Sequence, residues 1–318
     1  MKFLILLLTV GLLGLNGCSR EPPPVLRVGA NIWLGYEPLY LARDLGYLRG
    51  SPIHAVEFTS STQVLRAYQN ETIDAVCLTL DEALLLASEG SDLRIVLVAD
   101  FSNGADVIIG APGTRTMKDL QGQRVGVEDT ALGAFFLTRS LQESGMQTGD
   151  VRVVPMQVQD HEQALLNGDV DAVVTFEPVR GKLLGRDAHL LFDSSRLPSE
   201  IVDVVLVRAT YLQRHSQVVA DLVRGWQQAQ DYMTRTPDDA LARMARREGV
   251  TVEEMRAALH GVHLPSREQN RELLSGDESA LQPVLQRLAE FMLKSKLLHS
   301  PAPVDRLIDP QALSMAGQ

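Results

Sequence analysis

The sequence predicts an α/β protein with two lobes, each built on a mostly parallel sheet flanked by helices. From Leu26 onward, short apolar runs alternate with helical stretches, and this alternation is typical of parallel sheets covered by helices. Ala111-Pro-Gly113 interrupts the alternation, which then starts again as a second α/β unit. After Tyr211 the pattern becomes helical, with apolar positions three or four residues apart. At 318 residues, the chain is long enough for two domains.

The first unit is organised around the stretch Asn31-Ile-Trp-Leu-Gly-Tyr-Glu-Pro38, which joins its first strand to its first helix. Proline suits the first helical turn, where its missing N–H would have no partner. This junction places Trp33, Tyr36 and Glu37 at the carboxyl end of a strand, where open α/β sheets bind ligands. The strands predicted in this unit are Leu26–Ala30, Ile53–Phe58, Ala75–Leu78, Leu93–Ala99 and Asp106–Gly110, and the helices are Leu39–Leu45, Val64–Gln69 and Glu82–Ser88.

The second unit repeats the strand and helix pattern, beginning with a short helical turn at Met117–Gly122. Its predicted strands are Arg124–Val127, Val151–Val154, Ala172–Thr175 and Ala188–Phe192, and its helices are Ala131–Ser144, Asp160–Leu166 and one opened by Phe176-Glu-Pro178. The β-branched run Val202–Val207 is expected to cross back to the first lobe, paired with the outward crossing near Asp106–Gly110.

The C-terminal third is predicted to be helical and to cover the first lobe. The expected helices are Ser216–Arg235, Pro237–Arg247, Val252–His260 and Asp277–Leu298. The predicted domain limits are therefore 1–17 for a signal peptide, 18–25 for a tether, 26–108 with 206–318 for lobe 1, and 109–205 for lobe 2.

The N-terminus has the features of an export signal. Its apolar run from Phe3 to Leu15 is too short to cross a bilayer but suits a secretory signal peptide. It ends in Leu15-Asn-Gly-Cys18, which resembles a bacterial lipobox; the resemblance implies cleavage before Cys18 and lipidation of its thiol. The alternative is an ordinary signal peptide with a chance cysteine. We expect a lipid-anchored lipoprotein facing the periplasm, or the outer cell surface in a Gram-positive host.

Charge and motifs exclude several classes of function. Without Lys2 the chain carries 29 basic (30 minus one) and 40 acidic residues, a balance that argues against binding nucleic acid. The chain has no G-x-S-x-G, no P-loop and no H-E-x-x-H motif, so we predict neither an enzyme nor a cofactor. His260 and His263 are three residues apart, but no second ligand cluster accompanies them and no metal site is predicted. Cys77 lies in an apolar run and is expected in the core.

Three stretches together resemble one family, the bacterial extracytoplasmic solute-binding proteins of the nitrate/sulfonate/taurine type. The stretches are Gly35-Tyr-Glu-Pro-Leu-Tyr-Leu-Ala-Arg-Asp-Leu-Gly-Tyr-Leu48, Met117-Lys-Asp-Leu-Gln-Gly-Gln-Arg-Val-Gly-Val127 and Asp171-Ala-Val-Val-Thr-Phe-Glu-Pro178, the last with Phe176 where the family more often has Trp. The resemblance covers about Leu26 to Tyr211. It implies the type 2 periplasmic-binding-protein fold, two lobes joined by two crossing strands, with a ligand held between them for an ABC permease and ATPase. Relatives of this fold include a pyrimidine synthase of thiamine biosynthesis, but the cysteine cluster of that enzyme is missing here.

The resemblance also implies which residues face the ligand, all at carboxyl ends of predicted strands. They are Trp33, Tyr36, Glu37, Ser60, Ser61, Thr62, Thr79, Asp81, Asp129, Thr130, Thr175 and Glu177. For the Ser, Thr and Asp residues the alternative is capping of helix N-termini alone, which is worth about 1 kcal/mol each. Trp33 and Tyr36 are better explained as walls of a ligand site, because large aromatics in a glycine-containing loop pack poorly into a core.

The charge of these loops favours one class of ligand. Four carboxylates, Glu37, Asp81, Asp129 and Glu177, lie in them without a lysine or arginine. Repulsion would disfavour an anion, so we expect a neutral or cationic nitrogen-containing solute such as a pyrimidine or an amine. Acidic residues at helix starts also complement the helix dipole, which leaves nitrate or a sulfonate open as ligands. Two partners remain possible: an ABC importer, or a membrane receptor kinase or cyclase to which a sensory lipoprotein presents its ligand state.

Overall fold

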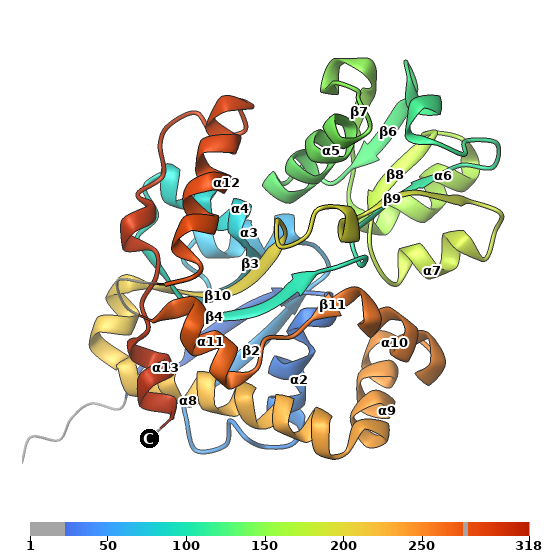
Figure 1. Ribbon diagram of the computed structural model, residues 1–318. Helices are drawn as coiled ribbons and strands as arrows, with labels where there is room; N and C mark the ends of the chain where they lie inside the picture. Colours follow the sequence, from blue (N-terminus) through green and yellow to red (C-terminus); the bar gives the residue numbers. More distant parts are fainter. Residues whose placement is uncertain (1–22, 276–278, 318) are drawn as a thin grey trace, which may run out of the picture.

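The computed structural model describes residues 23–275 and 279–317 and shows two lobes, each built around one sheet (Figure 1). Lobe 1 is the part that carries the six-stranded sheet, and lobe 2 is the part that carries the five-stranded sheet. The predicted α/β class is confirmed. Cys18 and the predicted signal peptide lie outside the described residues. Within the described part, no helix is long and apolar enough to cross a membrane.

The sheet of lobe 1 has the strand order β11-β4-β10-β3-β1-β2. Its strands are β1 (Leu26–Asn31), β2 (Ile53–Phe58), β3 (Ala75–Thr79), β4 (Leu93–Ser102), β10 (Val202–Arg208) and β11 (Val262–His263). β1 pairs in parallel with β2 and β3, whereas β10 is antiparallel to β3 and β4, and β11 is antiparallel to β4. The sheet is therefore mixed, not mostly parallel as predicted. Every residue of β3, Cys77 included, is buried, because helices cover both faces of the sheet.

Ser60, Thr79, Thr251 and Ser266 each cap a helix of lobe 1, whereas the other described helices of this lobe begin without a side-chain cap. The helices of lobe 1 are α2 (Glu37–Asp44), α3 (Ser61–Gln69), α4 (Leu80–Ser88), α8 (Ala209–Arg235), α9 (Pro237–Glu248), α10 (Val252–Ala258), α11 (Arg267–Leu274), α12 (Gln282–Lys294) and α13 (Gln311–Ala316). Pro38 lies in the first turn of α2, and the Ser60 side chain caps α3 by accepting from Gln63 N. α4 begins with a capping box in which Thr79 N donates to the Glu82 carboxylate at 3.2 Å.

The C-terminal helices cover lobe 1, as expected from the sequence (Figure 1). The predicted helix over 277–298 is shorter, and its first two residues lie outside the described part. Sequence analysis missed α11 and α13. α11 carries few apolar residues, but its capping box between Ser266 and Gln269 was a local signal for a helix start.

Lobe 2 has the strand order β7-β6-β8-β5-β9 and is also mixed. Its strands are β5 (Val107–Gly110), β6 (Arg124–Val127), β7 (Arg152–Pro155), β8 (Ala172–Thr175) and β9 (His189–Asp193), and its helices are α5 (Ala131–Glu143), α6 (His161–Asn167) and α7 (Val179–Leu184). β6 is parallel to β7 and β8, while β5 is antiparallel to β8 and β9.

Single 3-10 turns lie in both lobes and in the segment between β9 and β10, at Leu34–Tyr36, Met117–Leu120, Thr148–Asp150, Val158–Asp160, Ser194–Arg196, Leu259–Gly261 and Val304–Arg306.

The two lobes are joined by the segments 103–106 and 194–201. As expected, Val202–Val207 returns the chain to lobe 1, where it forms β10, whereas Asp106–Gly110 leads into β5 of lobe 2; the two runs do not pair with each other as strands. The segments themselves are held together at their ends: the Ser102 and Ser194 hydroxyls lie 2.7 Å apart, and Gly104 N donates to Ser194 Oγ at 2.6 Å. The predicted limits at 108/109 and 205/206 stay predictions.

Candidate functional site

A small cavity of about 20 Å³ lies between the lobes, at the carboxyl ends of strands from both sheets. This is the position at which open α/β sheets bind ligands. Its lining residues are Asn31, Trp33, Tyr36, Ser61, Thr79, Asp106, Glu128, Thr130, Leu132, Phe176 and Asp203. Asn31 ends β1 and Thr79 ends β3 in lobe 1, while Glu128 and Phe176 directly follow β6 and β8 in lobe 2. Both lobes therefore contribute residues to one cavity.

The two aromatic residues that the sequence singled out both line the cavity and are fixed by carboxylates. Trp33 Nε1 donates to Asp100 Oδ2 at 3.0 Å, and the Tyr36 hydroxyl donates to Asp203 Oδ1. Trp33 also meets Phe176 of lobe 2 edge to face, with ring centroids 5.5 Å apart. An aromatic pair of this geometry contributes beyond its buried area, so it favours the closed arrangement of the lobes.

Acidic side chains are concentrated at the cavity. Asp106, Glu128 and Asp203 line it, and among the residues 23–275 and 279–317 no lysine, arginine or histidine does. Asp106 and Asp203 are 4% and 2% exposed, and the Oδ2 atom of each has no hydrogen-bond partner in the described part of the chain. A buried polar atom without a partner is costly, and both residues line the cavity, so these two carboxyl groups are candidates to accept from a ligand donor.

Burial raises the pKa of these carboxyl groups. It brings the pKa of Asp106 to about 6 and, helped by the negative charge of Asp106, that of Asp100 to about 8, although the Trp33 indole opposes the second shift. Burial and the nearby Asp100 raise the pKa of Asp203 well above its usual value. Behind the cavity, burial raises the pKa of Asp81 to about 7. Without a ligand, part of this group of acids is therefore neutral near pH 7.

These raised pKa values predict that the ligand-free protein loses stability as pH rises. The folded state holds more protons than the unfolded state between the ordinary pKa, 3.8, and the folded value, so the free energy of unfolding falls across that range. We expect a loss of about 1–2 kcal/mol between pH 6.5 and 8. His161, whose pKa burial lowers to about 4, acts in the opposite direction mainly below pH 6.5. Urea unfolding at pH 6.5 and pH 8 measures the change in the free energy of unfolding. The Asp100→Asn variant should show a smaller change between the two pH values. A free energy of unfolding that rises with pH would contradict the prediction.

Polar contacts bridge the lobes beside the cavity. Glu128 Oε1 of lobe 2 accepts from Thr62 N at 3.0 Å and from Thr62 Oγ1 at 2.7 Å, at the start of α3 in lobe 1. Ser60 Oγ donates to Gln157 Oε1 of lobe 2 at 3.2 Å. The predicted residues Ser60 and Thr62 thus hold the closed arrangement in this structure, and Ser60 also caps α3.

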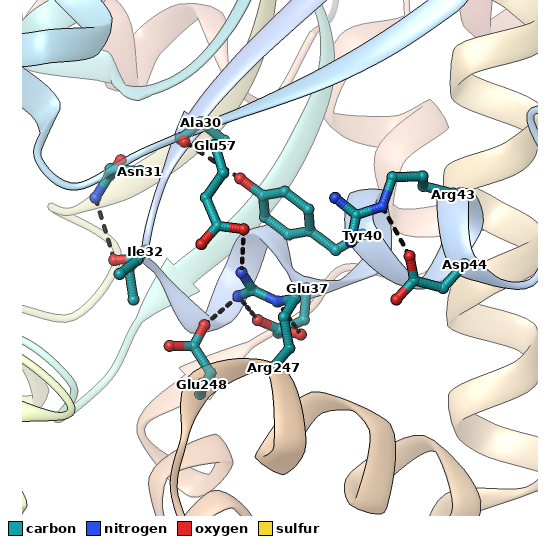
Figure 2. Close-up of polar contacts among 10 residues, drawn as sticks. All are labelled: Ala30, Asn31, Ile32, Glu37, Tyr40, Arg43, Asp44, Glu57, Arg247 and Glu248. Atoms are coloured by element: carbon teal, nitrogen blue, oxygen red, sulfur yellow. Dashed lines mark hydrogen bonds and ion pairs between the residues drawn. The ribbon is translucent and has the colours of Figure 1, made fainter.

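Glu37 does not line the cavity; it is buried in a separate ion-pair cluster (Figure 2). There the Arg247 guanidinium of α9 pairs with Glu37, with Glu248, and with Glu57 at 2.9 Å. Arg247 also lies over the Tyr40 ring, 4.1 Å from its centroid. Burial lowers the pKa of Arg247, but the hydrogen bonds and charges of its acids outweigh that effect and raise it. The expectation that Glu37 adds uncompensated charge to the ligand site is therefore wrong.

The other predicted residues are divided between the cavity and its surroundings. Ser61, Thr79 and Thr130 line the cavity, with Thr130 also capping α5. Thr175 is buried at the end of β8, and Asp81 is buried in the first turn of α4. Their assignment as ligand-binding residues stays a prediction.

Two further acids, Asp129 and Glu177, do not add negative charge to the cavity as the sequence led us to expect. Asp129 is exposed. Glu177 pairs with Arg180 at 2.9 Å and lines a small neighbouring pocket of about 20 Å³ together with Trp33. The loops contain no basic residue, as stated from the sequence, but Arg247 of α9 and Arg180 of α7 pair with Glu37 and Glu177 from outside these loops.

The acids that do line or support the cavity were missed by sequence analysis. Asp100 and Asp203 lie inside strands, in Ala99-Asp-Phe101 and Val202-Asp-Val204, and Asp106 precedes the apolar run of β5. An acid inside a fully apolar strand is costly to bury and was the available signal. Within the described residues, no group of three or more His, Cys, Asp or Glu side chains has an arrangement that could hold a metal ion.

The chain is similar to proteins named for sulfonate binding. A protein of Escherichia coli (strain K12), named as an aliphatic sulfonates-binding protein, is 24% identical over 261 residues, which are 79% of this chain and 81% of that protein. The alkanesulfonate-binding protein SsuA from Xanthomonas axonopodis pv. citri, solved bound to MOPS, superposes with a TM-score of 0.75 at 21% identity, covering 92% of this chain and 98% of that one.

Two further solved structures share the fold. The ligand-binding component of an ABC-type import system from Staphylococcus aureus gives a TM-score of 0.75 at 15% identity, with 92% and 99% of the two chains covered. The desulfurization enzyme DSZB gives 0.67 at 19% identity, with 92% and 98% covered, so this fold also serves an enzyme. The model of the NMT1-like family matches residues 19–247, well over half of the sequence. The chain therefore belongs to the NMT1-like family.

Proposed function

We propose that the protein is the solute-binding component of an ABC importer, and that its solute is a small cation or a neutral molecule rich in N–H donors, such as an amine or an aminopyrimidine. The choice of ligand class rests on the composition of the inter-lobe cavity. Three carboxyl groups line it, and among the described residues no basic side chain does. The importer role is supported by the resemblance to extracytoplasmic binding proteins and by the fold shared with an ABC-type import component.

The orphaned carboxylate oxygens define what a ligand must supply. Asp106 Oδ2 and Asp203 Oδ2 need donors, and an ammonium or amidine group has several. A cation would also lower the pKa of these groups and favour their ionised forms. An anion placed there would instead meet like charges in a site of low dielectric constant.

The aromatic rings fit the same ligand class. Trp33 and Phe176 form a corner of the cavity, one from each lobe. Aromatic faces attract cations and also stack on flat heterocycles, so both an ammonium and a pyrimidine ring could use them. Because the two rings come from different lobes, a ligand in contact with both stabilises the closed form.

A second ligand class, the sulfonates, is favoured by the comparisons, since the Escherichia coli relative is named for aliphatic sulfonates and the Xanthomonas structure holds MOPS. A thermal-shift screen of protein lacking residues 1–18 decides between them. It should be run in a buffer without sulfonates or primary amines. A ligand at about a thousandfold over its Kd adds roughly 4 kcal/mol and raises the melting temperature by several degrees. A response to amines or aminopyrimidines supports the proposal, and a response to sulfonates alone contradicts it.

A matched pair of variants tests the site. We expect Asp203→Asn, which keeps the shape of the side chain and removes its charge, to weaken binding of the cationic ligand about 10–100-fold in isothermal titration calorimetry. The reason is the loss of a buried carboxylate that lines the cavity. Asp44→Asn, on the exposed side of α2, removes the same charge and should leave the Kd unchanged. Equal affinity of the two variants would rule out the cavity as the cation site.

The importer role is separated from the alternative of a sensory lipoprotein by uptake. A strain without this chain should lose transport of the solute found in the screen, whereas a sensor would change a cellular response and leave transport intact.

Recovery of the solute unchanged after incubation tests the expectation that the protein is not an enzyme. Fractionation of Cys18→Ala protein tests the proposed lipid anchor, because the variant should leave the membrane fraction.

A further inference from the structure

The contact between Glu128 and α3 joins an anion to a helix N-terminus. Glu128 follows β6 in lobe 2 and is 7% exposed. Its Oε1 atom accepts from both the backbone N–H and the hydroxyl of Thr62, the second residue of α3. α3 has nine residues, and Ser60 caps its next free N–H, that of Gln63. The carboxylate therefore takes up the Thr62 N–H, one of the backbone donors that the capping serine leaves free at this helix start.

A helix start of this kind is suited to bind an oxyanion from solution. Its first N–H groups have no partner inside the helix, and the helix dipole adds partial positive charge at this end. Phosphate, sulfate and carboxylate groups bind to such positions. Here a carboxylate of the same chain is bound instead, and it comes from the opposite lobe, inside the cavity that Ser61 and Glu128 both line.

We propose that Glu128 is a built-in anion that occupies the oxyanion position at the start of α3 and thereby sets the charge selectivity of the cavity against sulfonates and other anions. This proposal rests on the proposed function, which supplies the class of ligand. Closing the lobes brings Glu128 onto Thr62, so an anion that bound at α3 would have to displace it. Displacement would leave a buried carboxylate without its two donors and close to the anion.

The same contact explains how the lobes can close on a cation. The cavity then contains the negative charge of Glu128 in addition to Asp106 and Asp203, and both Thr62 donors at the start of α3 are already bonded. A cationic solute neutralises the carboxylates of Glu128, Asp106 and Asp203 and needs no hydrogen-bond partner from α3. Glu128 is thus a specificity-determining residue whose removal should change the class of ligand, not only weaken binding.

The test compares sulfonate binding by the wild type, Glu128→Ala and Glu128→Gln, with Asp169→Ala as the control. Asp169 is an exposed acid of lobe 2, so its removal changes net charge by the same amount away from the cavity. MOPS and methanesulfonate are the probes, and isothermal titration calorimetry in a sulfonate-free buffer is the measurement. We expect Glu128→Ala to bind a sulfonate about tenfold or more tightly than the wild type, and Asp169→Ala to match the wild type.

The near-isosteric Glu128→Gln guards against a folding defect in the alanine variant, because it keeps the packing and removes only the charge. Gain of sulfonate binding in Glu128→Ala, smaller in Glu128→Gln and reduced again by adding Thr62→Val, supports the proposal. Equal sulfonate affinity of the wild type and both folded Glu128 variants overturns it. The proposed function is read separately: it fails if the wild type binds no amine or aminopyrimidine, and the sulfonate comparison still decides the role of Glu128.

Discussion

Replacing Arg247 by alanine is expected to lower the free energy of unfolding by about 3–5 kcal/mol. The side chain is 12% exposed and pairs with Glu37 and Glu248, which are 1% and 5% exposed. Its removal leaves two buried acids next to each other without a counter-charge, and breaking a buried ion pair in this way is strongly destabilising. Equilibrium unfolding in urea measures the change.

Arg243→Ala is the matched control, one turn earlier on α9. Arg243 pairs with Asp239 at 2.6 Å, but the two side chains are 40% and 50% exposed, so this pair should contribute below about 1 kcal/mol. If the two variants lose the same stability, the Arg247 cluster does not hold α9 to lobe 1 as Figure 2 suggests.

Trp33→Ala is expected to weaken ligand binding about a hundredfold. The indole lines the cavity, meets Phe176 across the lobes and donates to Asp100, so its removal loses an aromatic wall and frees a buried carboxyl group. Buried tryptophans at the centre of a contact commonly cost 2–4 kcal/mol on truncation, which corresponds to this factor. Calorimetry with the solute found in the screen gives the affinity, and circular dichroism checks the fold.

The second tryptophan provides an independent readout. The chain has two tryptophans, and Trp226 is fully buried in α8. In a Trp226→Phe variant, Trp33 is the only indole, and its fluorescence should change when ligand binds. In a Trp33→Phe variant the signal of Trp226 should stay constant. A ligand-dependent signal from Trp226 alone would place the solute elsewhere.

The local pattern of the sequence predicted most strands and helix starts because their signals are short-range. β2, β6 and β8 have the predicted limits, and Ser60, Thr79 and Thr130 stand at helix starts. The mixed character of the sheets could not be read in this way. Strand direction depends on where β5 and β10 pair, and an apolar run has the same composition in parallel and antiparallel pairing.

The sequence predicted where the inter-lobe cavity lies, but not which acidic residues line it. Trp33 and Tyr36 line the cavity, and they could be singled out from the sequence because aromatics in a glycine-containing loop are locally unusual. Arg247 neutralises Glu37 from 210 residues further along the chain, and nothing near Glu37 indicates that partner. Asp203 comes to the same cavity from β10, which the sequence placed only as a crossing strand. Such long-range partners decide which acids remain available to a ligand.

The way lobe 2 is inserted into lobe 1 has a consequence for the order of folding. All strands of lobe 2 lie between Ser102 and Val202, so this lobe can form from one continuous segment. The sheet of lobe 1 needs β10 between β3 and β4, which closes a loop of about a hundred residues; the length-dependent part of the entropic cost of closure is about 4 kcal/mol. A lobe 2 that has already folded brings its own ends together at Ser102 and Ser194 and shortens that loop. Contacts of high sequence separation slow folding, so we expect the sheet of lobe 1 to form more slowly than the contiguous lobe 2.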